Sequence, residues 1–595
     1  MLLRYLSLSM LLVFAGCATS VDQEDMSDRN TAASKRNIKS SLSNFNDSPK
    51  LFAAKTQLSE VERALKQNDL ARAKVVLELM VPPPQSLVIE YLFLSAQTAI
   101  ADRQSNAALS FLSDERLVNS KMDSVQAIEF AKLKSNAYLL NRSFIASAKE
   151  LMNIDSLLQR NERVENHDKI YELLMALPSR SLAVQADKEI NGTSRGWLSL
   201  AALTKQNEND PLLQLQALNK WKLAWAHHTA SKILPRSLEM LSKIVSERPT
   251  KVALFLPFQG PLSAAGKAIR DGFIAGQYAH QDEKTIILNY DTSTESITDL
   301  LERAKNEGIQ LIIGPLDRDI VTELASMELK IPVLALNRTS DKSFNPNLYQ
   351  FGLSPEDEIN QVVEQTLDEG LKESVVIYPD SDWGKRNFAV FENSWGLRGG
   401  NIVDSASFSS QRDYSGLIKS LLNIDKSEER EKELRRITGH SFEFTPRRRK
   451  DIDFILLLAN SSQARGINPT LEHFYAEDIP VYSISHIHEI NASWIDTIDL
   501  DGIKFCEIPW KLSAFDNVQR EIQANWSGAQ GGLAAFYALG LDAYRLYPRL
   551  RQLKELPHQK LFGTTGRLKI DQSNIIRREL IWATFKDGRP TRISF

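Results

Sequence analysis

Cysteine is almost absent from this sequence of 595 residues, in which Cys17 and Cys506 are the only two. If Cys17 carries a covalent modification, no disulfide bond can form within the chain, and packing alone must stabilise the fold. Cys506 lies among apolar residues and is expected to be a buried thiol. Neither sign of charge is in large excess, because the formal net charge is −3. No overall electrostatic field therefore attracts nucleic acid or an anionic membrane surface.

Catalytic motifs are lacking too. The sequence has no nucleophile elbow, no phosphate-binding glycine loop, no dinucleotide fingerprint and no zinc-protease helix. His486, His488 and Glu489 lie close together, but no cysteine or further histidine nearby completes a metal site. We therefore expect a protein that is not an enzyme and that holds neither a metal nor a cofactor.

What is present is the composition of ordinary soluble protein, with 43% hydrophobic and 25% charged residues. The chain is longer than one hydrophobic core normally supports, since domains usually hold roughly 100–200 residues. Several separate cores are expected.

The first residues have the pattern of a signal sequence. A basic residue precedes an apolar run, residues 6–14, which is too short to cross a membrane. The run ends at Ala15-Gly16-Cys17, where two small side chains would let a signal peptidase approach. This ending resembles a bacterial lipobox, which implies a signal peptide over residues 1–16 and a diacylglycerol and an N-acyl chain on Cys17. The alternative is a plain secretory signal followed by an unmodified cysteine.

The residues after Cys17 suggest where the protein is anchored. Ala18 follows the cysteine, and by resemblance to Gram-negative lipoproteins the lack of Asp there implies the periplasmic side of the outer membrane. Two or three acyl chains anchor a protein stably, whereas one is marginal. Residues 17–48 are polar and mixed in charge, which predicts a flexible tether with a reach of about 100 Å.

Residues 49–247 follow a helical pattern throughout. Apolar residues recur at spacings of three and four near the start of this region, at Leu58, Val61, Leu65, Ala71, Val75 and Leu79. Three similar phrases align on Ala73, Ala108 and Ala148, which are 35 and then 40 residues apart. This spacing resembles that of tetratricopeptide-type helical hairpins, which bury their apolar faces only against their neighbours. The region would bind a partner or serve as a spacer.

At residue 250 the pattern changes to short Val-, Ile- and Leu-rich runs that alternate with helices. Such β-α units predict doubly wound parallel sheets. The segments LPFQGP (256–261), IGPL (313–316) and LSP (353–355) resemble those of type I periplasmic binding proteins. The resemblance implies an α/β domain with two lobes over residues 250–595, hinge crossings near 350, 505 and 550, and a β-hairpin at the end.

A ligand cleft between two such lobes would lie at the carboxyl ends of the strands. Five polar residues near such ends are candidates to line it: Gln259, Ser263, Asp291, Asn337 and Tyr378. Alternatively, packed side chains close the cleft and it binds nothing.

A long charged insertion separates residue 422 from the strand at residue 453. Its Glu/Arg-rich part has opposite charges four residues apart, which favours a solvent-exposed helix. It ends in a basic run: Arg447, Arg448, Arg449 and Lys450. The run could recognise an acidic partner surface, or it could be a solvated loop.

Longer phrases narrow the resemblance. The segments GPLDRDIV (314–321), YPDSDWGKR (378–386), FTPRRRKDIDF (444–454) and QARGINPTLEHFYAEDIPVYSISHI (463–487) resemble the penicillin-binding protein activator LpoA family over essentially the whole chain. The resemblance implies a monomeric outer-membrane lipoprotein that binds the bifunctional inner-membrane synthase penicillin-binding protein 1A. It further implies that this contact stimulates peptide cross-linking in cell-wall synthesis and that the α/β domain makes it.

Two other functions fit the same layout. The chain could be a lipid-anchored solute receptor for an amino acid or a peptide fragment, because the α/β domain resembles such receptors. It could also be a scaffold in which the helical repeats hold partners and the α/β domain is inert.

Overall fold

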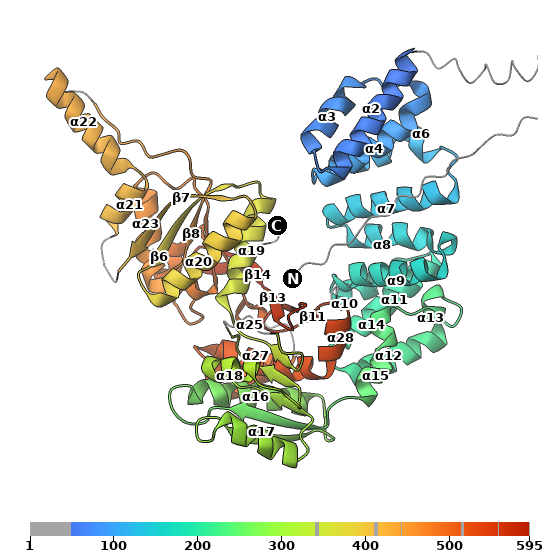
Figure 1. Cartoon of the computed structure of the whole chain (residues 1–595), viewed down its shortest axis with the longest axis vertical. Coiled ribbons are helices and arrows are strands. Elements are labelled where there is room, and N and C mark those ends of the chain that lie inside the picture. The colour runs from blue at the N-terminus through green and yellow to red at the C-terminus, as the bar shows by residue number, and fades with distance from the viewer. Residues whose placement is uncertain are drawn as a thin grey trace, which may run out of the picture. The chain divides into compact units, whose positions relative to one another are not determined.

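The computed structural model describes residues 49–339, 344–409, 414–441, 443–512, 517–556 and 559–593 (Figure 1). The predicted signal peptide, Cys17 and the tether up to residue 48 lie outside these ranges. Within them, every helix is too short or too polar to cross a membrane. The chain divides into two compact units, one ending at Ser143 and the other beginning at Phe144.

The first unit consists of helical hairpins around a single core. Its helices are α2 (Pro49–Lys66), α3 (Leu70–Leu79), α4 (Val88–Ala101), α5 (Ser105–Leu112), α6 (Glu115–Val118) and α7 (Ser124–Leu140). Leu58 and Val61 of α2 are fully buried, as predicted. The helix predicted from Ala71, Val75 and Leu79 is confirmed as α3, but Val75 and Leu79 are exposed. This helix buries Ala73 and Leu77, which pack in the core of the unit.

The repeat is visible in the turns as well as in the helices. Asn68, Arg103 and Arg142 each adopt a left-handed conformation, with φ of 58°, 58° and 54°. The residue after each donates its backbone N–H to a carbonyl five residues back, at 2.8–2.9 Å. This bond is the helix-ending arrangement called a Schellman motif. The same turn therefore recurs after 35 and then 39 residues, close to the 35 and 40 residues that separate the three alanines.

The second unit begins with further helices and continues into two α/β lobes. These helices are α8 (Phe144–Asn153), α9 (Arg160–Met175), α10 (Ser179–Lys188), α11 (Gly192–Gln206), α12 (Pro211–Ala224), α13 (Thr229–Lys232), α14 (Arg236–Glu239) and α15 (Leu241–Ser246). They are joined to the first lobe by buried polar contacts. The Arg549 guanidinium donates to the Gln214 side chain and to the Glu208 carbonyl, both at 2.8 Å. Gln552 donates to the Ser237 carbonyl at 2.9 Å.

The first lobe is built on a parallel sheet with strand order β2-β1-β3-β4-β5. The strands are β1 (Lys251–Leu256), β2 (Ile286–Asp291), β3 (Leu311–Ile313), β4 (Val333–Ala335) and β5 (Leu348–Gln350), and its helices are α16 (Ser263–Ala279), α17 (Ile297–Asn306), α18 (Arg318–Ser326) and α27 (Ala534–Leu546). Alternate residues of β1 belong to different cores, since Leu254 packs in one and Phe255 in the other. The sheet is therefore buried on both faces, as its apolar strands predict.

The second lobe contains a mixed sheet with strand order β15-β14-β10-β9-β8-β6-β7. Its strands are β6 (Glu373–Pro379), β7 (Asn401–Phe408), β8 (Phe454–Leu457), β9 (Val481–Ser483), β10 (Lys504–Glu507), β14 (Ile581–Lys586) and β15 (Arg589–Arg592). The helices are α19 (Pro355–Asp368), α20 (Asp382–Leu397), α21 (Ser415–Leu421), α22 (Ile424–Thr438), α23 (Ser461–His473) and α24 (Trp494–Thr497). The predicted helix in the charged insertion is confirmed as α22, which projects away from this lobe (Figure 1).

A small third sheet joins the lobes and differs from the prediction. It contains β11 (Leu561–Phe562), β12 (Arg567–Ile570) and β13 (Ile576–Glu579). The segments 566–571 and 579–588 predict the final hairpin, but they contain β12 and β14, which belong to different sheets. The hairpin at the end of the chain is instead formed by β14 and β15. The third passage between lobes thus lies at Leu580 rather than near 550, because Leu550 still packs in the core of the first lobe.

The predicted fold class is confirmed. Helical hairpins precede an α/β part with two lobes, and three chain passages connect the lobes in the manner of type I periplasmic binding proteins. These passages follow β5, β10 and β13.

Candidate functional site

The junction between the two lobes contains a buried network of ion pairs, which we call the lobe junction: Arg338, Asp357, Glu358, Arg577 and Arg578. Arg338 follows β4 of the first lobe, the two acidic residues lie in the first turn of α19, and the other two arginines lie on β13. The start of α19 is fixed by Ser354, whose hydroxyl accepts a hydrogen bond from the Glu356 N–H at 3.2 Å. Pro355 then occupies the first helical position, where it is well tolerated.

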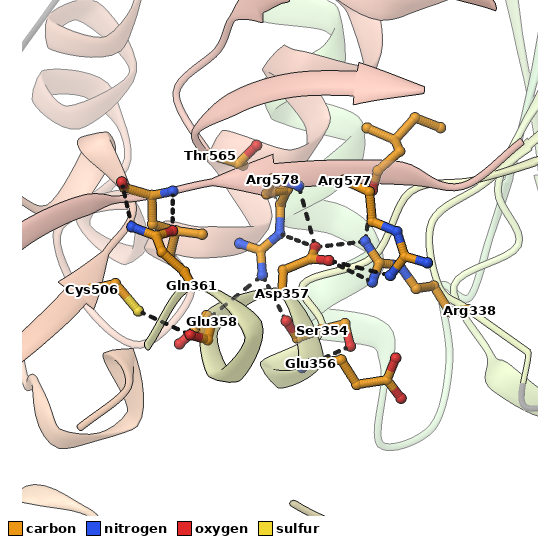
Figure 2. A network of polar contacts seen from close by, with 12 residues as sticks. Arg338, Ser354, Glu356, Asp357, Glu358, Gln361, Cys506, Thr565, Arg577 and Arg578 are labelled. Atoms are coloured by element: carbon orange, nitrogen blue, oxygen red, sulfur yellow. Dashed lines mark hydrogen bonds and ion pairs between the residues drawn. The ribbon is translucent and has the colours of Figure 1, made fainter. Parts of the chain in front are cut away.

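Asp357 is the centre of the lobe junction (Figure 2). Its carboxylate accepts two hydrogen bonds from the Arg338 guanidinium, at 3.0 and 2.6 Å. It also forms ion pairs with Arg577 and Arg578, both at 3.6 Å. The same Arg338 donates to the Ile576 carbonyl at 2.6 Å, so one side chain connects the first lobe to both α19 and β13.

Glu358 extends this network into the second lobe. One carboxylate oxygen lies 3.5 Å from the Arg578 guanidinium, and the other accepts the Ser485 N–H at 2.8 Å. Burial raises the pKa of Glu358, and the neighbouring Arg578 opposes that shift. Gln361, one turn further along α19, binds both the N–H and the carbonyl of Leu580, at 2.8 and 3.0 Å.

The Cys506 thiol lies at the same junction and is buried, as predicted. It contacts the Glu358 carbonyl, with the sulfur 3.8 Å from the oxygen. Burial raises the pKa of this thiol, so it stays protonated at neutral pH.

The lobe junction pairs charges across the first and third passages, and the Cys506 contact with Glu358 adds the second. Each of its carboxylates is within ion-pair distance of at least one guanidinium. Separating the lobes would leave buried charges without partners, which costs several kcal/mol per ion. The arrangement therefore holds the two lobes in one relative position, so that residues from both present a fixed surface.

Two of the five predicted cleft residues lie together in the first lobe. The Gln259 side chain donates to the Asp291 carboxylate at 3.5 Å. Asp291 also accepts the Phe258 N–H at 3.0 Å and the hydroxyl and N–H of Ser293. Burial raises the pKa of Asp291, but these hydrogen bonds outweigh burial and the pKa is lowered. The Asp291 carboxylate therefore joins the loop after β1 to the loop after β2.

The other three predicted residues have separate surroundings. Ser263 is the first residue of α16 and is half-buried. The Asn337 side chain donates to the Leu316 carbonyl at 2.9 Å, and the Tyr378 ring, which belongs to the other lobe, stacks on Phe388 at 4.6 Å. None of the five lines either of two surface pockets, of about 380 and 350 Å³, in the described part of the chain. That they line a ligand cleft stays a prediction.

The basic run divides into internal and exposed residues. Arg448 is buried and donates to the Tyr475 carbonyl at 2.6 Å, and its guanidinium also pairs with Asp478. Arg449 pairs with Asp451 at 2.8 Å and with a second carboxylate at 3.1 Å. Arg447 and Lys450 are exposed.

Sequence reasoning missed the lobe junction. Its members are separated by up to 240 residues along the chain, from Arg338 to Arg578, and no spacing rule connects them. The available signal was Arg577-Arg578 in a strand of the terminal β-region, because a charged pair in a central position needs buried partners.

The fold and this junction define a binding-protein-like architecture with helical repeats in front of it. The chain belongs to the family described as "LppC putative lipoprotein", whose model matches residues 33–588. The resemblance to the LpoA family that the sequence analysis found is confirmed, because curated relatives carry the name "Penicillin-binding protein activator LpoA".

Two of these relatives and one solved structure illustrate the similarity. The protein from Aliivibrio fischeri is 27% identical over 467 residues, which cover 78% of this chain and 77% of the relative. The protein from Vibrio cholerae is 25% identical over 532 residues, 88% of each chain. A crystal structure of Haemophilus influenzae LpoA has a TM-score of 0.53 at 20% identity, covers 91% of this chain and 94% of that one, and shows the same fold.

Proposed function

We propose that this chain is a non-catalytic lipoprotein that binds and activates a peptidoglycan synthase, penicillin-binding protein 1A. The observation that carries the proposal is the similarity along nearly the whole chain to proteins named as penicillin-binding protein activators. Coverage of 88% on both sides means that the helical and α/β parts are shared together. The activity that would be raised is the synthase's peptide cross-linking.

Activation of this kind is a coupling between two equilibria. The activator must bind the active conformation of the synthase more tightly than the inactive one, since only differential affinity shifts a population. The lobe junction supports such a role. A surface that is already fixed before binding loses less conformational entropy on contact, so more of the interaction energy is available for the partner.

The same proposal includes the anchor. Cys17 would carry the diacylglycerol and the N-acyl chain, and the protein would sit at the periplasmic face of the outer membrane. The Cys17→Ala variant should then move from the membrane fraction to the soluble fraction of the envelope, while its folded domains keep their melting temperature.

The test uses soluble protein that begins at Ala18, mixed with detergent-solubilised penicillin-binding protein 1A and its lipid-linked precursor. The expected result is more cross-linked product than the synthase makes alone. A folded chain that neither binds the synthase nor raises the amount of product would contradict the proposal. A ligand-dependent rise in melting temperature would then support the solute receptor.

A further inference from the structure

Three large apolar side chains are exposed together on the second lobe. Trp494, Ile495 and Ile498, which we call the apolar ridge, expose 51%, 64% and 47% of their surface. They lie on α24 and on the short helix η5 (Ile498–Leu500) that follows it. Single exposed apolar residues are common on protein surfaces, but several in a row mark an interaction surface.

The apolar ridge is held rigidly against the hairpin of β14 and β15. Thr497 is buried and its hydroxyl donates to the Gly588 carbonyl at 2.6 Å. The Asp501 carboxylate accepts the N–H groups of Asp587 and Gly588, at 2.9 and 2.8 Å. A Cβ on Gly588 would lie 2.1 Å from the Trp494 carbonyl oxygen, so the two backbones are in direct contact. The ridge therefore needs no ordering when a partner arrives.

A groove of about 380 Å³ borders the ridge. Trp494, Phe585 and Pro590 form apolar parts of its wall. Its basic lining residues are His488, Lys511 and Arg589, and Glu489 is the exposed acidic one.

These basic groups are placed by a buried carboxylate. Glu507 is fully buried and lies 2.8 Å from His488 Nδ1 and 3.2 Å from Lys511 Nζ. Glu507 pairs with His488 and Lys511, whereas Arg589 is exposed at the edge of the groove. The groove thus combines an apolar wall with an exposed arginine, which is complementary to a large apolar side chain beside a carboxylate.

We propose that the apolar ridge and this groove are the docking surface for the synthase. The occupant is a segment of the synthase that inserts an apolar side chain into the groove and places an acidic residue against Arg589. This inference rests on the proposed function and adds the site of contact to it. A Trp and an Arg at one surface are the residue types that most often dominate binding energy.

The test measures the dissociation constant of full-length soluble chain for detergent-solubilised synthase. Trp494→Ala and Arg589→Glu should each weaken binding about tenfold or more. Arg589→Glu should also reduce the dependence of binding on salt, because a charge pair is lost. Ile495→Glu provides a second test of the ridge at a more exposed position, in case Trp494→Ala lowers the melting temperature.

Matched controls come from the same protein. Leu397→Ala removes an apolar side chain of the second lobe that is 81% exposed, and Lys330→Glu reverses an exposed charge of the first lobe. Both should bind within about twofold of the unaltered chain, as surface substitutions outside an interface do.

The outcomes separate this inference from the proposed function. Unaltered chain that binds the synthase, together with folded Trp494, Ile495 and Arg589 variants that bind it equally well, would overturn the docking surface alone. Unaltered chain that does not bind would overturn the proposed function. Variants that keep synthase binding but lose self-association in sedimentation would assign the surface to a second copy of this chain, which also overturns the inference.

Discussion

Neighbouring acidic residues at the start of α19 have opposite environments. Glu356 is exposed, whereas Asp357 is buried among three guanidinium groups. A buried ion pair adds little compared with a well-packed apolar pair, but removing one partner leaves the other charge buried alone. The contribution of Asp357 to stability therefore becomes measurable when its side chain is removed by substitution.

The Asp357→Ala variant should lose about 3–5 kcal/mol of unfolding free energy, because Arg338 and Arg578 would stay buried without their carboxylate. Urea denaturation of the soluble chain measures the change. The Glu356→Ala variant is the control and should differ by less than about 0.5 kcal/mol. Equal stability of the two variants would show that the lobe junction does not hold the lobes together.

The basic run contains a second contrast between neighbours. Arg448→Ala should destabilise the chain by about 1–2 kcal/mol, since the Tyr475 carbonyl loses its donor and the buried stem of the arginine is lost. Lys450→Ala should leave stability unchanged within about 0.5 kcal/mol. Thermal unfolding of both variants distinguishes them, and a stable Arg448 variant would contradict its structural role.

This contrast determines how the run can be tested in binding. Replacing all four basic residues at once would confuse a lost contact with a damaged fold. Changing only Arg447 and Lys450, which are exposed, tests whether the run steers association. A lower association rate with a weaker salt dependence would support that role.

Among the elements, α16 and α27 of the first lobe are in direct backbone contact. A Cβ on Gly540 would lie 2.1 Å from the Ile269 carbonyl oxygen, and one on Gly272 would lie 2.3 Å from the Tyr537 carbonyl oxygen. Each helix thus places a glycine against the backbone of the other. No larger residue fits unless the helices move apart.

The Gly540→Ala variant should therefore be destabilised by about 1–3 kcal/mol, the usual cost of overpacking a core. The control is Gly396→Ala in α20, where a Cβ would have no neighbour within 4 Å. Alanine favours helix, so that variant should be as stable as the unaltered chain or slightly more so. A melting temperature for Gly540→Ala that matches the control would contradict the close packing.

Elements with a regular apolar pattern could be predicted from the sequence. Elements that are held in place by contacts with distant polar residues could not. β8 and the part of β1 that follows Lys251 are apolar and buried on both faces, so they could be recognised directly. β13 has the sequence Ile-Arg-Arg-Glu and owes its place to ion pairs with distant residues. The face that α3 buries depended on Ala73 rather than on the larger Val75, because close helix contact selects the small residue.

The candidate binding surfaces, too, could be predicted only in part from the sequence. The basic run could be located from the sequence, but the burial of Arg448 depends on Asp478 and the Tyr475 carbonyl, which tertiary folding brings near. The apolar ridge gave no regular signal, since Trp494, Ile495 and Ile498 lie in a short, irregular segment. Only their exposure in the folded chain distinguishes them from core residues.

At the scale of the whole molecule, the change from helices to α/β structure and the division into compact units fall at different places. Helices continue to Ser246, but the first unit ends at Ser143. Helices α8 to α15 cover buried polar groups of the first lobe, among them Arg549 and Gln552. Burial lowers the pKa of Arg549 to about 10.

Two deletions should therefore behave differently. Removing residues 49–143 takes away a unit with its own core and should leave the melting temperature of the remainder nearly unchanged. Removing residues 49–247 would expose the surface around Arg549 and should lower that temperature by several degrees or cause aggregation. Scanning calorimetry of both proteins would show it, and equal melting temperatures would contradict the joining of α8–α15 to the lobes.

The most direct measurement of the central claim is the amount of cross-linked product that solubilised penicillin-binding protein 1A makes with two forms of this protein. One is the soluble chain from Ala18, and the other lacks residues 49–143 in addition. Our account predicts that both raise the amount of product to a similar maximum, because the docking surface lies in the second unit. Stimulation by the longer form alone, with both forms folded, would assign the contact to the helical hairpins, and no stimulation by either would contradict the activator function itself.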